Sequence, residues 1–231
     1  KREITRRSPL TVAQVALSQS AVLLPEGSQV DRLLAGTMAL LVALRLRFSD
    51  AQRARDEPQL DLDPEGGGYV ELPLGVTKNS RKPDLVAADK VAVGHAFGLA
   101  GLAWAPAWVA LRKKMGLCAQ RDGCLVPAFL PDGSFAKRRL RSGELLAWMA
   151  SYLKRVRVMS PGQRLGSHSG KATLLSWAAK YSVDKSTRRD LGYHIARKNR
   201  SVHTYSRDYQ AAPLRRLAMV LKAVDNKEFD P

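Results

Sequence analysis

The chain has 231 residues, of which 45% are hydrophobic and 26% are charged. This balance is typical of a globular protein with a sizeable core, and it excludes general disorder. Lys and Arg number 38 against 21 Asp and Glu, a formal net charge of +17, which indicates a polyanionic partner. Two cysteines, Cys118 and Cys124, are too few for a disulfide framework or a four-cysteine zinc site, so we expect free thiols in an intracellular protein.

The positive charge is concentrated in the second half of the chain. Residues 1–100 carry 13 basic and 12 acidic side chains, whereas residues 101–231 carry 25 basic and 9 acidic side chains. We therefore expect the polyanion-binding surface mainly in the second half. The alternative is a solvated basic face that has no partner.

The uncharged stretch from Val91 to Leu111 is long enough to span a membrane. It is rich in Ala and Gly, which contribute little transfer energy, and His95 and Pro106 interrupt it. We therefore expect no membrane association, and we interpret the stretch as a buried loop followed by a core helix from about Pro106.

The spacing of apolar residues predicts a mostly helical chain. Helices are expected over 8–17, 30–46, 106–115, 142–153, 168–181, 184–191 and 213–224. Short strands are expected over 69–72, 74–77 and 85–86, after a break at the glycines 66–68, and the Pro- and Gly-rich stretch after Met115 is expected to be irregular. The expected fold class is mixed, mostly α with a small three-stranded antiparallel β-sheet, in a single domain over residues 1–231.

Polar residues in four segments suggest phosphodiester chemistry. A glycine-rich phosphate loop, a His-Glu-x-x-His motif and a Cys-x-x-Cys pair are all absent from the sequence. The segments instead place single basic residues, a histidine pair and a tyrosine in a fixed order along the chain. The candidate residues are Arg47, Lys78, His168, Lys171, His194 and Tyr205.

The order of these residues resembles the catalytic domain of the tyrosine recombinases, the phage-integrase family. Arg47-Phe48-Ser49-Asp50 is similar to the family's Arg-x-Ser-Glu/Asp motif at the end of an apolar helix, and Lys78 matches its hairpin lysine. The run from His168 to Thr173 is similar to its His-x-x-Arg box. Leu191-Gly192-Tyr193-His194, followed by Tyr205, is similar to its Leu-Gly-His and tyrosine motifs.

The resemblance covers about residues 10–225 and implies DNA strand cleavage and rejoining through a 3′-phosphotyrosyl intermediate. It implies that Arg47 and Lys171 hold the phosphate oxygens, with His194 as a further donor. Tyr205 is then the nucleophile and His168 helps it to ionise, while Lys78 protonates the departing 5′ oxygen. No metal, nucleotide or other cofactor is implied, because the phosphotyrosyl link keeps the energy of the bond that was broken.

The implied partner is double-stranded DNA, on which the protein is expected to self-associate. The additional N-terminal helical domain of full recombinases is expected to be absent from this chain. The strings 191–194 and 204–208 look most like the eukaryotic mobile-element branch, so a nuclear location is expected if the host is eukaryotic.

Two departures from the family pattern leave other functions open. Lys171 replaces the second arginine, and an ammonium group cannot form the two-pronged phosphate contact of a guanidinium. One residue is also inserted before His194. The alternatives are a catalytically impaired DNA-binding relative of the same fold and a basic RNA-binding protein.

Each candidate also has an ordinary structural interpretation. Arg47 fits a solvated helix end, Lys78 a polar turn, and His168 the start of a helix. Tyr205 competes as nucleophile with three other tyrosines, at positions 181, 193 and 209. The four tryptophans, at positions 104, 108, 148 and 177, lie in apolar helical settings and are expected to belong to the core.

Overall fold

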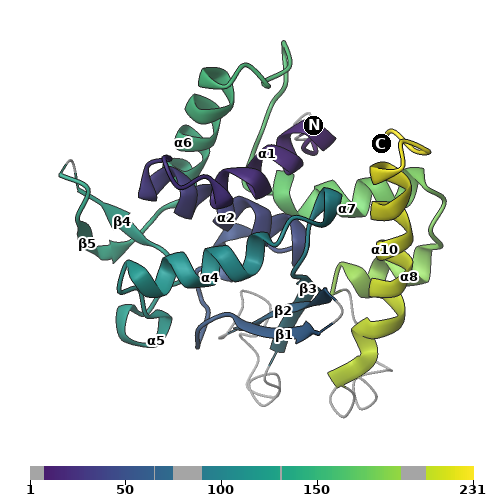
Figure 1. The fold of residues 1–231 in the computed structure, drawn as a ribbon, viewed down its shortest axis with the longest axis horizontal. Helices are drawn as coiled ribbons and strands as arrows, with labels where there is room; N and C mark the ends of the chain where they lie inside the picture. Colours follow the sequence, from purple (N-terminus) through teal and green to yellow (C-terminus); the bar gives the residue numbers. More distant parts are fainter. Residues whose placement is uncertain (1–7, 65, 75–89, 131, 194–206) are drawn as a thin grey trace, which may run out of the picture.

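The computed structural model describes residues 8–64, 66–74, 90–130, 132–193 and 207–231 (Figure 1). The helices are α1 (Val12–Leu23), α2 (Gln29–Ala43), α3 (Phe48–Ala51), α4 (Trp104–Lys114), α5 (Ala119–Asp122), α6 (Ser142–Arg155), α7 (Ser169–Lys180), α8 (Lys185–Leu191) and α10 (Ala211–Asp225), with 3-10 turns η3 (Leu99–Gly101) and η5 (Arg207–Gln210). The strands are β1 (Gln59–Asp63), β2 (Gly67–Leu74), β3 (Lys90–His95), β4 (Pro127–Phe129) and β5 (Phe135–Arg139).

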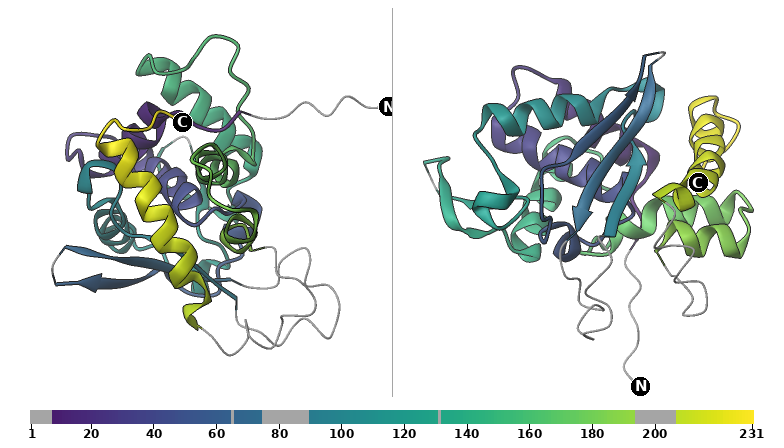
Figure 2. Two further views of the ribbon diagram at one scale, coloured as in Figure 1. Left: turned by 90° about the vertical axis from the view of Figure 1, so that its right-hand side faces the viewer. Right: turned by 90° about the horizontal axis from the view of Figure 1, so that it is seen from below.

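Helix α2 is the centre of the core. Every residue from Leu33 to Ala43 is buried, and the helix packs against α1, α4, α6, α7 and β3 (Figures 1 and 2). The closest approach is at Gly36, where the indole of Trp108 from α4 lies on the α2 backbone. A Cβ atom at Gly36 would stand 2.0 Å from Trp108 Cδ1. The same indole donates a hydrogen bond to the Leu33 carbonyl at 2.9 Å, so α4 is fixed against α2 by packing and by a polar contact.

The three-stranded sheet is antiparallel, with β2 between β1 and β3. In its register Leu60 pairs with Val70, and Val70 pairs with Gly94. Strand β3 approaches the end of α2 so closely that a Cβ atom at Gly94 would be 2.4 Å from the Ala43 carbonyl oxygen. The expected mostly helical architecture with a small three-stranded antiparallel sheet is confirmed.

The strands lie at different residues from those expected. Strand β2 contains the expected strand 69–72 and Leu74, the first residue of the expected strand 74–77, and it runs through Pro73. Residues 75–89, with the rest of that strand and the expected return strand, lie outside the described residues. The expected break at the glycines is the turn from β1 to β2, which passes through Gly66, while Gly67 and Gly68 begin β2, and Gly68 has a φ of 131° that suits glycine.

The uncharged stretch 91–111 begins with strand β3, where a buried loop was expected. The chain from 96 to 103 is irregular and contains η3, and α4 begins at Trp104, close to the expected start of the core helix at Pro106. Within the described residues, no helix has both the length and the apolar character that a membrane span requires.

A second sheet occupies part of the stretch that was expected to be irregular. Strands β4 and β5 pair antiparallel, and the rings of Phe129 and Phe135 lie 5.5 Å apart. Gly133, with a φ of 84°, lies in the connection. The prolines and glycines of this stretch therefore mark a hairpin.

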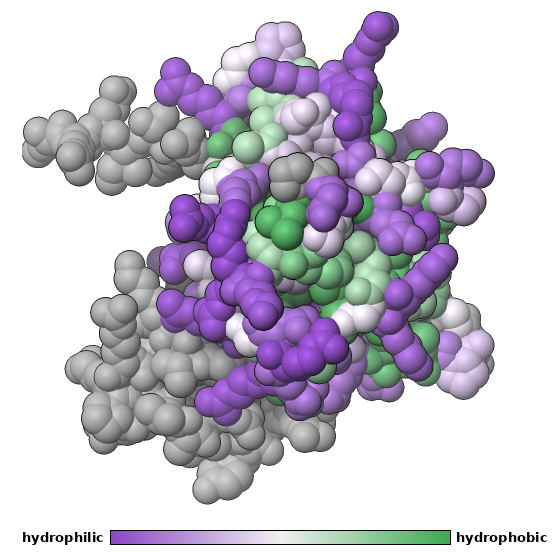
Figure 3. Space-filling model, turned by 90° about the vertical axis from the view of Figure 1, so that its left-hand side faces the viewer, coloured by the Kyte–Doolittle hydropathy of each residue, from purple (hydrophilic) through white to green (hydrophobic). Residues whose placement is uncertain are grey.

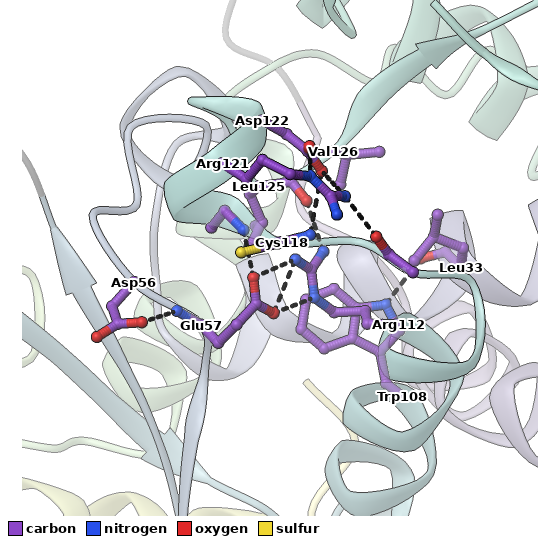
Figure 4. A network of polar contacts seen from close by, with 12 residues as sticks. Leu33, Asp56, Glu57, Trp108, Arg112, Cys118, Arg121, Asp122, Leu125 and Val126 are labelled. Carbon is purple, nitrogen blue, oxygen red and sulfur yellow. Dashed lines mark hydrogen bonds and ion pairs between the residues drawn. The ribbon is translucent and has the colours of Figure 1, made fainter.

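An ion pair between a buried arginine and a partly exposed glutamate joins α4 to the segment before the first sheet (Figure 4). The Arg112 side chain is 1% exposed, and its guanidinium donates to both carboxylate oxygens of Glu57 at 3.0 and 3.1 Å. It also donates to the Leu125 carbonyl at 2.5 Å, while the Ala119 backbone N–H donates to Glu57. This network links α4, the start of α5 and the irregular segment that leads into the β4–β5 hairpin.

The tryptophans belong to the core, as expected. Trp104, Trp108 and Trp177 are each at most 2% exposed. Trp148 is partly buried, stacks on Tyr152 with ring centroids 5.0 Å apart, and donates to Asp31 at 2.7 Å.

The space around Gly36 and around Gly143 predicts opposite effects on stability when each is replaced by alanine. Gly36→Ala is expected to lower the free energy of unfolding by about 3 kcal/mol, because α4 must move away from α2. Gly143→Ala, in the first turn of α6 where a Cβ meets nothing within 4 Å, is expected to raise it by about 0.5 kcal/mol. Urea unfolding of the two variants checks both signs, and a neutral Gly36→Ala would contradict the close packing.

Candidate functional site

Three of the six predicted site residues lie among the described residues, and they come from two helix starts. Arg47 precedes the first residue of α3, His168 precedes the first residue of α7, and Lys171 lies in the first turn of α7. The other three, Lys78, His194 and Tyr205, lie outside the described residues.

Arg47 is held by the residues on both sides of it. Leu46 and Phe48 are buried, at 4% and 1% exposure, and the Arg47 carbonyl accepts from the backbone N–H groups of Asp50 and Ala51 at 3.0 and 3.1 Å. The Arg47 Nε is buried and has no hydrogen-bond partner in the described part of the chain. A buried donor without a partner costs about 1–3 kcal/mol, so this N–H group is available to donate to an oxygen atom of a ligand.

The first turn of α7 is fixed by buried hydroxyl groups. Thr173 Oγ1 donates to the Ser169 carbonyl at 2.7 Å and accepts from the Leu10 N–H at 3.0 Å, while Ser169 Oγ accepts from the Gly166 N–H at 3.0 Å. A Cβ at Gly170 would come within 3.0 Å of Leu41 Cβ, so this turn also packs tightly on α2. The turn that carries Lys171 is therefore rigidly placed.

Lys171 connects α7 to the end of α8. Its half-buried ammonium donates to the carbonyl of Gly192 at 3.0 Å, the residue that caps α8. A lysine has three N–H donors, so two of them remain for another acceptor. His168 is exposed, and its Nδ1 lies 3.3 Å from Ser167 Oγ.

Arg47 lies close enough to His168 and Lys171 for its positive charge to affect their protonation. Burial lowers the pKa of Lys171, and the positive charge of Arg47 lowers it further. Partial desolvation of its ring lowers the pKa of His168, and the charges of Arg47 and Lys171 add to this effect. Asp50 opposes both shifts. The N-terminus of α7 adds a positive dipole, so the arrangement favours a bound anion.

Sequence reasoning missed one buried arginine beside this site. The Arg45 side chain is 0% exposed and its φ is 50°, a left-handed conformation that is unusual for arginine. It donates to the carbonyls of Leu191, Ala43 and Val93 at 2.9, 2.5 and 3.0 Å. The signal for it was a charged residue in the apolar run 44–46.

The same guanidinium also contacts described residues on both sides of 194–206, a range that the structure does not describe. It donates to the Tyr193 hydroxyl and to Gln210 Oε1, each at 3.1 Å. Gln210 in turn donates to the Asp190 carbonyl at 2.8 Å. Arg45 therefore holds α8 and η5 beside the end of α2.

The described tyrosines near the site are engaged in the fold. The Tyr193 hydroxyl accepts from the Val93 N–H at 3.2 Å and from Arg45, and burial raises the pKa of Tyr193. Burial also raises the pKa of Tyr209, to about 12. Tyr181 packs its ring edge-on against Phe229 at 5.1 Å.

Within the described residues, no group of three or more His, Cys, Asp or Glu side chains is arranged to hold a metal ion. The cations of the site are instead suited to an anion that carries several oxygens. A phosphate group meets that description.

The comparisons with known proteins concern the fold. No protein-family model matches the sequence, and no curated protein matches it. Among solved structures, the chain is similar to XerH, a site-specific recombinase determined with its difH substrate in a pre-cleavage complex. The TM-score is 0.50 and the sequence identity is 13%, with 91% of this chain and 54% of XerH covered. The chain thus spans about half the length of XerH, and the expected fold class, like the catalytic domain of a tyrosine recombinase, is confirmed.

The charge coupling predicts a measurable pKa change at His168. Because Arg47 disfavours the protonated ring, Arg47→Gln is expected to raise the His168 pKa toward its ordinary value, as measured by NMR titration of the ring protons. A lowered pKa also means that the folded state loses stability as the pH falls below the ordinary histidine range, because the unfolded chain then binds the proton more readily. That loss should be smaller in Arg47→Gln.

His95 is the internal control for this titration. Burial lowers its pKa as well, but its ring contacts the Leu214 carbonyl at 3.1 Å and its charged neighbour is Arg45. The His95 pKa is therefore expected to stay unchanged in Arg47→Gln. An unchanged His168 pKa would contradict the proposed proximity of the two groups.

Proposed function

We propose that the chain cleaves and rejoins DNA strands through a 3′-phosphotyrosyl intermediate. The observation that carries this proposal is the buried, unpartnered Nε of Arg47 beside Lys171 and His168. The expected residue order and the recombinase-like fold support the same conclusion. The proposed substrate is double-stranded DNA, on which copies of the protein associate.

The proposed cleavage step transfers the phosphoryl group from the 5′ oxygen of the DNA to the tyrosine oxygen. The Tyr205 oxygen attacks the scissile phosphorus and the bond from phosphorus to the 5′ oxygen breaks. The tyrosine proton passes to His168, and Lys78 supplies a proton to the departing 5′ oxygen. Rejoining reverses these transfers with a 5′ hydroxyl as the attacking group.

The described side chains suit their proposed roles. Arg47 and Lys171 would bind the non-bridging oxygens, where negative charge develops in the transition state, and His194 would add a further donor. The lowered pKa of His168 keeps its ring neutral near pH 7, as a proton acceptor requires. The placement in the eukaryotic mobile-element branch is part of the proposal and rests on the sequence strings at 191–194 and 204–208.

One observation favours a second function, DNA binding without cleavage. The ammonium of Lys171 already donates to the Gly192 carbonyl, and a single ammonium cannot reproduce the two parallel contacts of an arginine. The same residues would then hold a backbone phosphate without activating it. Both functions bind DNA, so only a test for covalent chemistry separates them.

Covalent trapping on a nicked suicide duplex tests the proposal. The wild-type chain is expected to form a protein–DNA adduct, and Tyr205→Phe is expected to form none while it keeps its fold and DNA affinity, because only the phenolic oxygen is removed. Tyr181→Phe and Tyr209→Phe are the matched controls and should keep the adduct. An adduct that persists in Tyr205→Phe would assign the nucleophile elsewhere, and no adduct in any variant would favour the second function.

Substitutions of Lys171 test the phosphate contact in the same assay. Lys171→Arg is expected to keep or raise the rate of adduct formation, since a guanidinium restores the two-pronged contact. Lys171→Ala is expected to lower the rate at least about 100-fold, the usual effect of removing one charge-stabilising donor. Equal rates for the alanine variant and the wild type would exclude Lys171 from the site.

A further inference from the structure

We propose that strand β5 and its continuation form a second DNA-binding element, which holds backbone phosphates beside the site of cleavage. The element consists of Lys137, Arg139 and Arg141, called the basic row below. The proposal rests on the proposed function, because it adds a contact to the same duplex. Figure 3 faces the end of the molecule where β4 and β5 lie and shows hydrophilic side chains projecting from it.

The alternation of side chains along an extended strand creates the basic row. Residues two apart lie on the same face of a strand, and all three members of the row are exposed. Of the two residues between them, Leu140 is buried at 6% exposure. Arg138 is exposed like the row, but it forms two contacts with the Glu144 carboxylate, at 2.6 and 2.9 Å.

No member of the basic row forms an ion pair among the described residues. The ion pairs found there join Arg112 to Glu57, Arg121 to Asp122, Arg138 to Glu144 and Arg155 to Asp31. Glu144 accepts from the Arg138 guanidinium and from the backbone N–H of Arg141 at 2.7 Å, and the charge of Arg141 also helps to lower the Glu144 pKa. The three side chains of the row are thus exposed and outside any ion pair found there, so they can contact an external anion.

A buried glutamine fastens the row to the candidate site. Gln52, at 4% exposure, donates to the carbonyls of Val126 and Leu140 at 2.8 and 2.9 Å and accepts from the Val126 N–H at 2.9 Å. Gln52 ends α3, and Arg47 immediately precedes the same helix. Because Leu140 lies between two members of the row, this contact connects the row to the helix that follows Arg47.

The spacing of the row suits a nucleic-acid backbone. Neighbouring members are two strand residues apart, about 6.8 Å, whereas DNA rises 3.4 Å per nucleotide along one strand. The interval is twice that rise, so flexible basic side chains at this interval can reach every second phosphate along one strand. The firm attachment to α3 would then align those phosphates with the one that Arg47 binds.

The salt dependence of duplex binding tests the proposal. The triple variant Lys137→Gln, Arg139→Gln and Arg141→Gln is expected to reduce the slope of log affinity against log salt concentration by about 2 to 3, since each phosphate contact contributes about 0.9. The matched control, Lys154→Gln, Lys180→Gln and Lys222→Gln, removes the same charge from exposed ends of α6, α7 and α10. It is expected to change the slope by less than about 1.

Adduct formation at saturating protein and low salt, measured in parallel, separates this proposal from the proposed function. A row variant with a reduced slope and an undiminished adduct yield would support the basic row as a binding element. A wild-type chain that forms adduct, while the row variant and the control have equal slopes, would overturn the row and leave the proposed function standing. Loss of affinity confined to single-stranded RNA would also overturn it, and failure of the wild type to bind the duplex would overturn both.

Discussion

The buried guanidinium of Arg45 is the interaction on which the arrangement of the candidate site depends. A charge taken out of water is costly unless its donors are satisfied, and here carbonyls, a hydroxyl and an amide satisfy them. Their parent elements are the end of α2, strand β3, the end of α8 and turn η5. Burial lowers the pKa of Arg45. The ordinary pKa of an arginine is so far above neutral pH that the side chain stays charged. One side chain thus joins elements that are up to 165 residues apart in sequence.

Next to the elements that Arg45 joins, further positive charges lie beside one another, an arrangement that is unfavourable in the absence of an anion. The charge of Arg47 disfavours the protonated forms of His168 and Lys171, and the Arg47 Nε has no hydrogen-bond partner among the described residues. Natural folds retain such local costs mainly at functional sites. An anion with several oxygens would relieve both the repulsion and the unsatisfied donor. That balance, more than any single residue, favours phosphate binding.

The sequence predicted the helices better than the sheets. Helix α8 has strong local signals, Asp184 as the N-cap and Gly192 at the end, and the structure has both. Strand β3 has no such signal, because its run of small and apolar residues fits a buried loop equally well. The reason for a glycine in this strand, the close approach of Gly94 to the Ala43 carbonyl, is visible only in the structure. The hairpin of β4 and β5 was missed because Pro127 and Gly133 are also typical of irregular chain.

The candidate site shows the same division between local and long-range information. Arg47, His168 and Lys171 could be chosen from their order in the sequence, and the structure brings the three together. Arg45 was visible in the sequence only as a charged residue in an apolar run, and its role could not be predicted because its partners lie in four separate segments. Likewise, the sequence placed the basic surface in the second half of the chain. It could not show that the contacts of Gln52 connect strand β5 to the helix that follows Arg47, because those contacts form between distant segments.

The central claim is that Arg47, with Lys171 and His168, binds the scissile phosphate. The most direct measurement is an experimental structure of the Tyr205→Phe chain bound to an uncleaved duplex, in which the distance from Arg47 Nε to the phosphate oxygens is read. The account predicts a non-bridging oxygen about 2.7–3.0 Å from Nε, with a second oxygen within hydrogen-bond reach of the Lys171 ammonium. A duplex bound at another surface, with Arg47 Nε contacting no phosphate, would contradict it.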